Sequence, residues 1–448
     1  MTEPVPLTPL EPWIAAKIGS QGAGLSLEAL RSYQLARLNE TLSLVQRNSV
    51  FYKRRLGAGE ISLGALDDLA DLPFTAASQL RAAPLEFLCV SQSEVHRIVT
   101  LPTSGTTGAP KRIFFTGADQ ELTRDFFHWG MSTLVAPGDR VLILLPGELP
   151  GSVGYLLREG LARMDVEGIP HGLVTELGRT LEVMRAERAT ALVGIPIQVL
   201  QLARVASAGG RPRCAGLQSV LLSTDRVPRA AAKAIKETWG CDVYNHYGST
   251  EMGLGGGVDC RARTGYHLRE ADLYFEIVDP ISGRPAPEGE SGEVVFTTLT
   301  RTAMPLVRYR TGDVSRFIPE PCSCGTVLRR MEHVDGRLDG GVELPGGGML
   351  RQSDLDEALL TVEGLADFST QFIRQGERAS LVVRVRWLVG TARRKHSEVM
   401  GALRRVQALA DEMAGERVTI DVLDWEDHVG APPRAAKRRI EYSREAQT

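Results

Sequence analysis

The sequence predicts an α/β protein of two parts, a large N-terminal domain over residues 1–338 and a small α+β C-terminal domain over residues 339–448. Short apolar runs alternate with helical stretches in the middle of the chain, which is typical of βαβ units and a mostly parallel sheet. Two further strand-like runs, 273–280 and 292–299, then predict a β-rich region. Finally, glycine and aspartate concentrate in DGRLDGGVELPGGG, residues 335–348, and this composition predicts a hinge.

The elements of the N-terminal domain follow from their apolar spacing. Leu, Tyr and Val recur at helical intervals over residues 25–48, which predicts a helix. Further along the chain, each apolar run is followed by a helical pattern. The predicted pairs are a strand from Val141 with a helix over 155–164, a strand over 190–196 with a helix over 197–206, and a strand over 217–223 with a helix over 228–240, after which 241–248 forms another strand.

The remaining elements are strand pairs and one helix. The runs 273–280 and 292–299 are separated by the turn-rich ISGRPAPEGESG, so they are predicted to form a hairpin-like antiparallel pair. Beyond the hinge, 380–388 and 417–425 are predicted strands that flank one long helix over 393–413. These elements make the small α+β domain.

Composition and charge limit the classes of function. The chain has 448 residues, of which 43% are hydrophobic and 24% charged, as in ordinary globular proteins. A net charge of −3 provides no field that would attract nucleic acid or an anionic membrane, so we expect neither partner. The N-terminal segment has no basic start and no apolar signal core, which predicts a cytoplasmic protein. Six cysteines in a chain of this length do not predict a disulfide framework.

The segment TLPTSGTTGAPKRIFFT, residues 100–116, places a hydroxyl- and glycine-rich stretch and a lysine before an apolar run. It is not a P-loop, because Pro110 and Arg112 stand where that pattern requires glycine and serine or threonine. Glycines let backbone N–H groups converge on an anion, hydroxyls add donors, and a lysine adds positive charge. A solvated turn is the alternative. We expect a phosphate-binding loop built from Thr103, Ser104, Gly105, Thr106, Thr107, Gly108 and Lys111.

Three more motifs follow this loop in order. They are YNHYGSTEMG at 244–253, YRTGDVSRF at 309–317 and DGRLDG at 335–340. Together with T-S-G-T-T-G-x-P-K, they resemble the signatures of the acyl-adenylate-forming superfamily, which contains acyl-CoA synthetases, luciferases and peptide-synthetase adenylation domains. The segment 260–337, with EIVDPISG, GEVVFTTLTRTAMPLVRYRTGD and PCSCGTVLRR, resembles the phenylacetate–CoA ligase branch in particular.

The resemblance implies a reaction with two halves. A carboxylate attacks the α-phosphorus of ATP, pyrophosphate leaves, and an acyl-adenylate forms; the thiol of coenzyme A then takes the acyl group. This implies ATP, Mg²⁺, coenzyme A and a small carboxylic acid as ligands, and a homodimer as the assembly. It also implies that the large domain is an adenylate-forming domain with mostly parallel sheets and a β-rich subdomain. The small domain would be a mobile lid that turns about a hinge at Asp339 between the two halves of the reaction.

The resemblance assigns roles around the phosphates. The loop 103–111 would bind the β- and γ-phosphates, and Lys111 would offset the charge of the leaving pyrophosphate. Thr250 would donate to the α-phosphate, and Glu251 would hold Mg²⁺, which prefers oxygen ligands. Lys437, in the basic tail PPRAAKRRI, would enter the site for adenylation. A solvated tail is the alternative for this lysine.

The resemblance also assigns the nucleoside contacts. Asp313 would accept hydrogen bonds from both ribose hydroxyls, a task suited to an ionised carboxylate, and Arg337 would touch the ribose. Two segments would bind the nucleotide, and the second would also reach the acyl carbonyl. These segments are Ser223, Thr224 and Asp225, and Asn245, His246, Tyr247, Gly248 and Ser249.

A candidate zinc site is formed by Cys260, His267, Cys322 and Cys324. Four nitrogen and sulfur ligands are the usual complement of a structural tetrahedral zinc, and four protein ligands leave no open position for catalysis. The resembling branch has Cys and His at matching places. Reduced cysteines in a β-rich corner are the alternative.

Two segments depart from the family pattern. GVELPGGGMLRQ, residues 341–352, replaces a run such as M-I-I-R-G-V-N that helps form the coenzyme A side of relatives. LLPGELPGSVG, residues 144–154, lacks the aromatic residues of relatives that accept aryl acids, so phenylacetate itself is not the expected substrate. Phe127, His128 and Trp129 are candidates for an acyl pocket, with core packing as the alternative.

The function predicted is an AMP-forming acid–CoA ligase. Two alternatives remain open at this point. One is an adenylyltransferase that stops at an AMP adduct, as the deazaflavin-coenzyme synthetases do. The other is a non-catalytic nucleotide-binding regulatory homologue, against which the presence of Lys111, Thr250, Glu251 and Asp313 argues.

Overall fold

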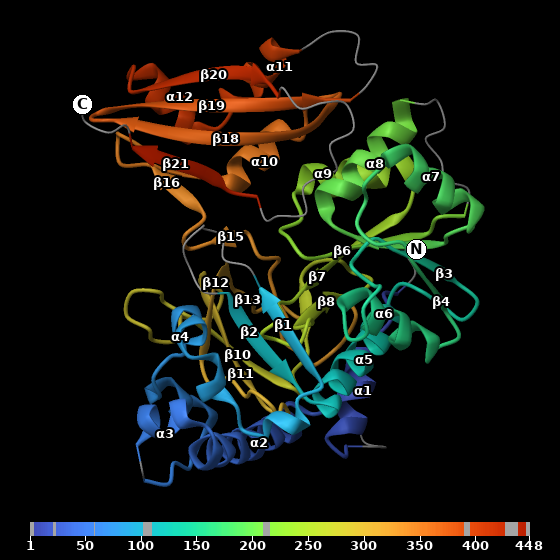
Figure 1. Cartoon of the computed structure of the whole chain (residues 1–448), viewed down its shortest axis with the longest axis vertical. Coiled ribbons are helices and arrows are strands. Elements are labelled where there is room, and N and C mark those ends of the chain that lie inside the picture. The colour runs from blue at the N-terminus through green and yellow to red at the C-terminus, as the bar shows by residue number, and fades with distance from the viewer. Residues whose placement is uncertain are drawn as a thin grey trace. The chain divides into compact units, whose positions relative to one another are not determined.

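The protein is described by a computed structural model (Figure 1). Within the part of the chain that it describes, no helix is both long and apolar enough to cross a membrane. The described residues are 4–20, 24–57, 59–101, 110–208, 216–388, 395–425 and 438–444.

The chain folds into two compact units, and each is discontinuous in sequence. Unit 1 consists of Met1–Gly138, Gly147–Gly168 and Tyr244–Val334, and unit 2 consists of Asp139–Pro146, Ile169–Val243 and Asp335–Thr448. The C-terminal residues thus belong to the same compact unit as the βαβ segment before them. The predicted division into 1–338 and 339–448 remains a prediction.

The helices of unit 1 cover its strands and supply its core. Helix α2 begins where the Ser26 hydroxyl accepts the N–H of Ala29, and it buries Leu38 and Leu42 in a core shared with Phe275 and Phe296. This confirms the helix predicted over 25–48. The α-helices of this unit are α1 (Leu10–Lys17), α2 (Leu27–Asn48), α3 (Val50–Leu56), α4 (Ala77–Ala82), α5 (Gly117–Met131) and α6 (Val153–Ala162), with short 3₁₀ turns at Leu66–Asp71, Pro84–Phe87 and Gln92–Glu94.

The strands of unit 1 are antiparallel. The predicted hairpin-like pair is confirmed, because β10 pairs along its whole length with β11 in antiparallel fashion and β12 continues the sheet. A second set runs from β7, which enters from unit 2, through β8, β9 and β14 to β13. The strands are β1 (Arg97–Leu101), β2 (Lys111–Phe115), β7 (Asp242–Tyr247), β8 (Gly257–Asp259), β9 (Tyr266–Leu268), β10 (Leu273–Val278), β11 (Gly292–Thr298), β12 (Tyr309–Ser315), β13 (Phe317–Ile318) and β14 (Arg330–Met331).

Unit 2 contains the predicted βαβ pattern. Strands β3, β5 and β6 pair in parallel, and the apolar runs that form them are buried on both faces, as parallel strands usually are. Helix α9 ends at Gly240, which takes the left-handed conformation that favours glycine. These elements are β3 (Arg140–Ile143), β4 (Glu167–Pro170, at the boundary with unit 1), α7 (Leu177–Ala186), β5 (Ala191–Gly194), α8 (Pro196–Ala208), β6 (Ser219–Leu222) and α9 (Arg229–Trp239).

The C-terminal residues of unit 2 form a four-stranded sheet in the order β20-β19-β18-β21, drawn in orange and red in Figure 1. The two central strands, β18 and β19, are antiparallel, whereas the outer strands β20 and β21 pair in parallel with β19 and β18, respectively. The elements are β15 (Gly336–Arg337), β16 (Gly341–Glu343), β17 (Met349–Arg351), α10 (Gln352–Leu359), β18 (Leu365–Gln375), β19 (Arg378–Trp387), α11 (His396–Leu403), α12 (Gln407–Ala414), β20 (Val418–Asp424) and β21 (Ile440–Arg444).

The prediction of one long helix over 393–413 is wrong. The structure has two helices, α11 and α12, because the chain leaves the helical conformation at Val406, whose ψ is 107°. Val406 and Leu409 are both buried, so the break lets each helix bury its own apolar side chains. Because the helical spacing of apolar residues continues across the break, the sequence pattern did not indicate that the helix is interrupted.

Candidate active site

Lys111 is the first residue of β2 and the point at which the predicted phosphate loop ends. It pairs in register with Leu101, the last residue of β1, so the two ends of the loop are held together by a strand pair. The loop residues themselves, Thr103, Ser104, Gly105, Thr106, Thr107 and Gly108, lie outside the described residues, as does Lys437.

The Lys111 ammonium donates to the carboxylate of Glu251 and also lies 3.5 Å from the Tyr309 hydroxyl. The same carboxylate oxygen, Oε1, accepts a 3.0 Å hydrogen bond from Tyr309. Burial would raise the pKa of Glu251, but the Lys111 charge and the hydrogen bonds from Lys111 and Tyr309 outweigh it and hold that pKa below its ordinary value. Glu251 is therefore an ionised carboxylate although only 4% of the residue is exposed.

The turn that carries Glu251 is closely packed. Arg301, itself buried, donates a 2.6 Å hydrogen bond to the Glu251 carbonyl. Gly248 lies where a Cβ would approach the Leu254 carbonyl oxygen to 2.7 Å, so only glycine fits. The Ser249 hydroxyl accepts the N–H of Met252 and closes the turn. Thr250, between Ser249 and Glu251, is half-buried.

Asp313 lies on β12 and is held from two sides. Its carboxylate accepts a 2.9 Å hydrogen bond from the Tyr247 hydroxyl, and its backbone N–H donates to the Thr311 hydroxyl at 3.0 Å. Burial and the neighbouring Asp313 charge raise the pKa of Tyr247 well above its ordinary value, so this phenol remains a neutral donor.

Asn245 and His246 lie in the part of β7 that belongs to unit 1. The Asn245 backbone N–H donates to the buried Asp259 carboxylate at 2.8 Å, while its side-chain oxygen is buried without a hydrogen-bond partner among the described residues. Burial lowers the pKa of His246 to about 4, so the imidazole is neutral at physiological pH. Its ring adjoins those of Phe126 and Phe127, with centroids 6.0 and 6.2 Å away.

The three acyl-pocket candidates on α5 differ in their surroundings. Phe127 is buried beside His246, whereas His128 and Trp129 stack on each other at 4.9 Å and are half-buried. Of the three, Phe127 is the one that the structure brings to the predicted nucleotide segment.

The remaining predicted residues belong to unit 2. Ser223 is buried, Thr224 has a φ of 77°, which is strained for a residue other than glycine, and Asp225 accepts the N–H of Arg438 at 3.4 Å. Arg337 and Asp339 form an exposed ion pair of 3.1 Å.

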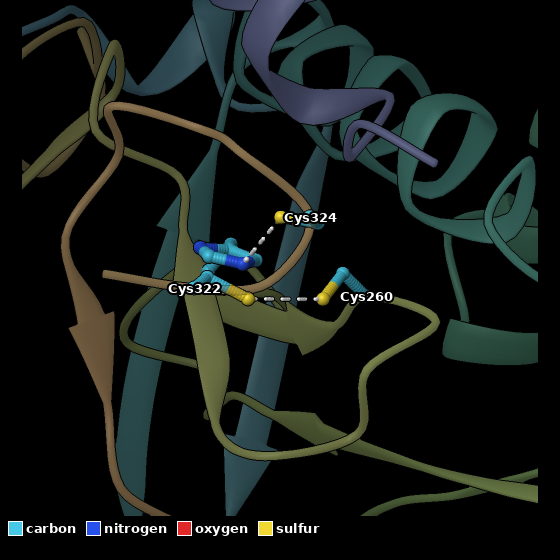
Figure 2. A group of neighbouring side chains, drawn as sticks. Cys260, Cys322 and Cys324 are labelled. Carbon is cyan, nitrogen blue, oxygen red and sulfur yellow. Dashed lines mark hydrogen bonds between the residues drawn. The ribbon is translucent and has the colours of Figure 1, made fainter. Parts of the chain in front are cut away.

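The cysteine and histidine cluster is assembled in unit 1. Cys260 follows β8, His267 lies in β9, and Cys322 and Cys324 lie between β13 and β14. The sulfurs of Cys260 and Cys322 are 3.6 Å apart (Figure 2), and the Cys324 sulfur is 3.4 Å from His267 Nε2. All four ligand atoms lie within 4.8 Å of one another and all four residues are buried.

The pKa values of the Cys260 and Cys324 thiols in the cluster shift in opposite directions. The hydrogen bond to Cys324 and burial raise the pKa of Cys260. Hydrogen bonding to Cys260 and His267 lowers the pKa of the Cys324 thiol to about 3, despite its burial. Among the described residues this is the only group of three or more His, Cys, Asp or Glu side chains that includes cysteine and could hold a metal ion. The predicted residues therefore do come together, and the donor set fits zinc.

Two residues that share the site were not predicted as part of it. Tyr309 holds Glu251, and Arg301 holds the turn that carries it. Tyr309 opens the motif YRTGDVSRF, so the sequence marked its position without indicating its contact.

Comparison with known proteins identifies the family. The family described as AMP-binding enzyme matches residues 62–300. The phenylacetate–coenzyme A ligase of Thermus thermophilus is 33% identical over 329 residues, which span 70% of this chain and 72% of that enzyme. The phenylacetate–coenzyme A ligase of Pseudomonas putida is 30% identical over 80% of this chain and 82% of that enzyme. The chain belongs to the AMP-binding enzyme family, which confirms the resemblance seen in its motifs.

Solved structures agree on the fold. 2-Hydroxyisobutyryl-CoA ligase, in the postadenylation state with 2-HIB-AMP, matches with a TM-score of 0.78 at 23% identity, over 93% of this chain and 90% of that chain. An anthranilate CoA ligase with anthranoyl-AMP matches with a TM-score of 0.53 at 16% identity, over 77% and 67% of the two chains. The predicted α/β fold class is confirmed.

Proposed function

We propose that this member of the AMP-binding family is an AMP-forming acid–CoA ligase. The observation that carries the proposal is the pair of carboxylates Glu251 and Asp313, each held by a phenol, with Lys111 beside the first. The curated relatives described above carry the names of acid–CoA ligases, which supports the same conclusion. A protein that only binds a nucleotide has no need of a buried, ionised carboxylate at the phosphate end.

Adenylation requires little covalent chemistry from side chains. It requires that two anions, the acid and ATP, be brought together and that the leaving charge be neutralised. Lys111 supplies a positive charge at the exit of the predicted phosphate loop, and Thr250 supplies a hydroxyl to the α-phosphate. Asp313 supplies an acceptor for the ribose hydroxyls.

Glu251 is the residue that would hold Mg²⁺. It fits this cation because it stays ionised and offers oxygen ligands. When bound, Mg²⁺ would neutralise charge on the phosphate oxygens. Lys111 and Tyr309 keep the carboxylate of Glu251 oriented and buried.

Two features of β7 support the nucleotide and acid contacts. The side-chain oxygen of Asn245, which has no hydrogen-bond partner within the described part of the chain, suits an amine donor such as the exocyclic amine of adenine, since a buried acceptor without a donor is unfavourable. The neutral imidazole of His246, with Phe126 and Phe127 beside it, suits an acid with an apolar body next to its carboxylate.

The second half of the reaction transfers the acyl group to coenzyme A. Asp339 as the hinge, Lys437 as the lysine of adenylation, and the nucleotide contacts of Ser223, Thr224, Asp225 and Arg337 belong to this proposal as well. They rest on the resemblance of the motifs that contain them.

A structural zinc ion bound by Cys260, His267, Cys322 and Cys324 is part of the proposal. The short separations of the four ligand atoms and the burial of all four residues support it. Four protein ligands give zinc a role in stability rather than in the reaction.

ATP–pyrophosphate exchange tests the function directly. Exchange is measured with phenylacetate, benzoate and 2-hydroxyisobutyrate, followed by AMP release with and without coenzyme A. We expect exchange that depends on one apolar acid and AMP release that depends on coenzyme A. Exchange without any effect of the thiol would instead identify an adenylyltransferase, and no exchange in protein that binds ATP would identify a regulatory homologue.

A further inference from the structure

Each of two signature segments contains a tyrosine four residues before its carboxylate. The first has Tyr247 and Glu251, and the second has Tyr309 and Asp313. The structure pairs them crosswise. Tyr247 donates to Asp313 of the other segment at 2.9 Å, and Tyr309 donates to Glu251 of the other segment at 3.0 Å.

The Tyr309–Glu251 contact is buried, and the Tyr247–Asp313 contact is partly buried. Tyr247, Tyr309 and Glu251 are buried, and Asp313 is half-buried. A hydrogen bond to a charged group in such surroundings is stronger and more directional than one between neutral groups. Each phenol therefore restricts the orientation of the carboxylate that it touches.

The ring of each tyrosine is held in place by contacts that do not involve its hydroxyl group. The Tyr309 ring packs against Phe296 at 5.4 Å, and the Tyr309 backbone pairs with β11 on one side and with Thr75 on the other. The Tyr247 ring stacks on Tyr266 at 5.7 Å, and the Tyr247 carbonyl accepts the N–H of Gly256 at 2.9 Å. Removal of either hydroxyl thus leaves the ring and the strand held by other contacts.

We propose that Tyr247 and Tyr309 are positioning residues that act crosswise, Tyr247 orienting Asp313 for the ribose and Tyr309 orienting Glu251 for the metal-bound phosphates. The inference rests on the proposed function, because it uses the roles given there to the two carboxylates. Its distinctive consequence is that each tyrosine affects the ligand of the other segment. Tyr309 lies in the same motif as Asp313, the proposed ribose ligand, yet it acts on the dependence of ATP binding on Mg²⁺. Tyr247 lies in the same motif as Glu251, the proposed Mg²⁺ ligand, yet it acts on recognition of the ribose.

The test uses Tyr247→Phe and Tyr309→Phe in the full chain, with Tyr274→Phe on β10 as the matched control. Isothermal titration gives the ratio of affinities for ATP and 3′-deoxy-ATP, and the Mg²⁺ concentration at which ATP binding is half-maximal. We expect Tyr247→Phe to reduce the preference for ATP over 3′-deoxy-ATP by about tenfold, the effect of one lost charged hydrogen bond. We expect Tyr309→Phe to raise the Mg²⁺ requirement by about tenfold for the same reason.

Each variant should leave the other readout, and its thermal transition, close to those of the control. Equal movement of both readouts in both variants would overturn the inference, because a general loosening of the fold would act in that way. Unchanged readouts in both variants would also overturn it, while the wild-type exchange activity would leave the proposed function standing. A wild-type chain that binds no ATP would overturn the proposed function and the inference together.

Discussion

At the scale of single residues, His246 is a half-buried histidine whose protonation opposes folding. Its pKa is lowered to about 4 by burial, whereas an unfolded histidine titrates near 6.5. Between these values the unfolded chain binds a proton that the native chain does not. The contribution of this group to stability is therefore complete above pH 6.5 and is lost as the pH falls toward about 4.

We expect the free energy of unfolding of the wild type to fall by about 3 kcal/mol through this group as the pH falls over that interval. His246→Asn removes the titration, so its stability should depend less steeply on pH, whatever its absolute value. His171→Asn, which replaces another half-buried histidine, in unit 2, is the control. Urea denaturation at several pH values measures the slope, and identical slopes in the wild type and His246→Asn would contradict the prediction.

The individual residues of the site were easier to predict than their partners. Glu251, Asp313 and Lys111 stand in motifs that the sequence displays, and their roles toward ATP stay predictions. The contacts of Tyr309 with Glu251 and of Tyr247 with Asp313 span 58 and 66 residues. Local pattern contains no information about pairs so far apart, because they depend on how β7 and β12 are brought together.

At the scale of elements, the turn between β7 and β8 should tolerate no side chain at Gly248. A Cβ there would meet backbone atoms of Leu254 and Gly255, which cannot rotate away. We expect Gly248→Ala to cost about 1–3 kcal/mol of stability and to reduce exchange activity. Gly401→Ala, in α11 with open space around the Cβ, should instead stabilise the protein by about 0.5–1 kcal/mol. Thermal denaturation of the two variants checks this, and a stable Gly248→Ala would contradict it.

The loop between β13 and β14 should depend on zinc. We expect Cys322→Ser to lower both bound zinc and the thermal transition, because metal binding and folding are linked. Cys89→Ser, at a buried cysteine in another part of unit 1, should keep its zinc. Metal analysis and calorimetry measure both quantities. Purified wild type that is free of zinc and as stable with a chelator as without one would rule the site out.

Apolar spacing that matches burial predicted the helices α2, α6, α8 and α9 and the strands β3, β5, β6, β7, β10, β11, β19 and β20. No range was assigned from the sequence to the other helices of unit 1, to α7 and α10, or to the remaining strands. The single helix predicted over 393–413 was wrong, because buried Val406 and Leu409 continue the helical spacing through a residue that is extended. The energetic preference for that break comes from packing between elements, which spacing along one helix does not record. The predicted domain boundary between residues 338 and 339 stays a prediction, because a boundary also depends on packing between elements.

At the scale of the whole molecule, Arg438 joins three distant segments of unit 2. Its guanidinium pairs with Asp367 at 2.7 Å and with Asp356 at 3.1 Å, and it stacks on Phe368. Its backbone N–H reaches Asp225. The buried carboxylates depend on this cation, since a buried charge without a partner is costly.

We expect Arg438→Ala to destabilise unit 2 by about 3–5 kcal/mol, the usual cost of breaking a buried ion pair from one side. Arg439→Ala is the matched control, because Arg439 is the next residue and is exposed. Limited proteolysis and urea denaturation compare the two. Equal stability of the two variants would show that the contacts of Arg438 contribute nothing.

The interleaving of the two units along the chain has a consequence for synthesis on the ribosome. Unit 1 lacks its last segment until Val334 has been made, and unit 2 lacks its C-terminal sheet until later still. Residues 139–146 and 169–243 emerge early, but unit 2 is complete only after residues 335–448 have also been synthesised. The nascent protein therefore exposes apolar surface of both units for much of its translation, and partly folded chains of this kind are prone to aggregate.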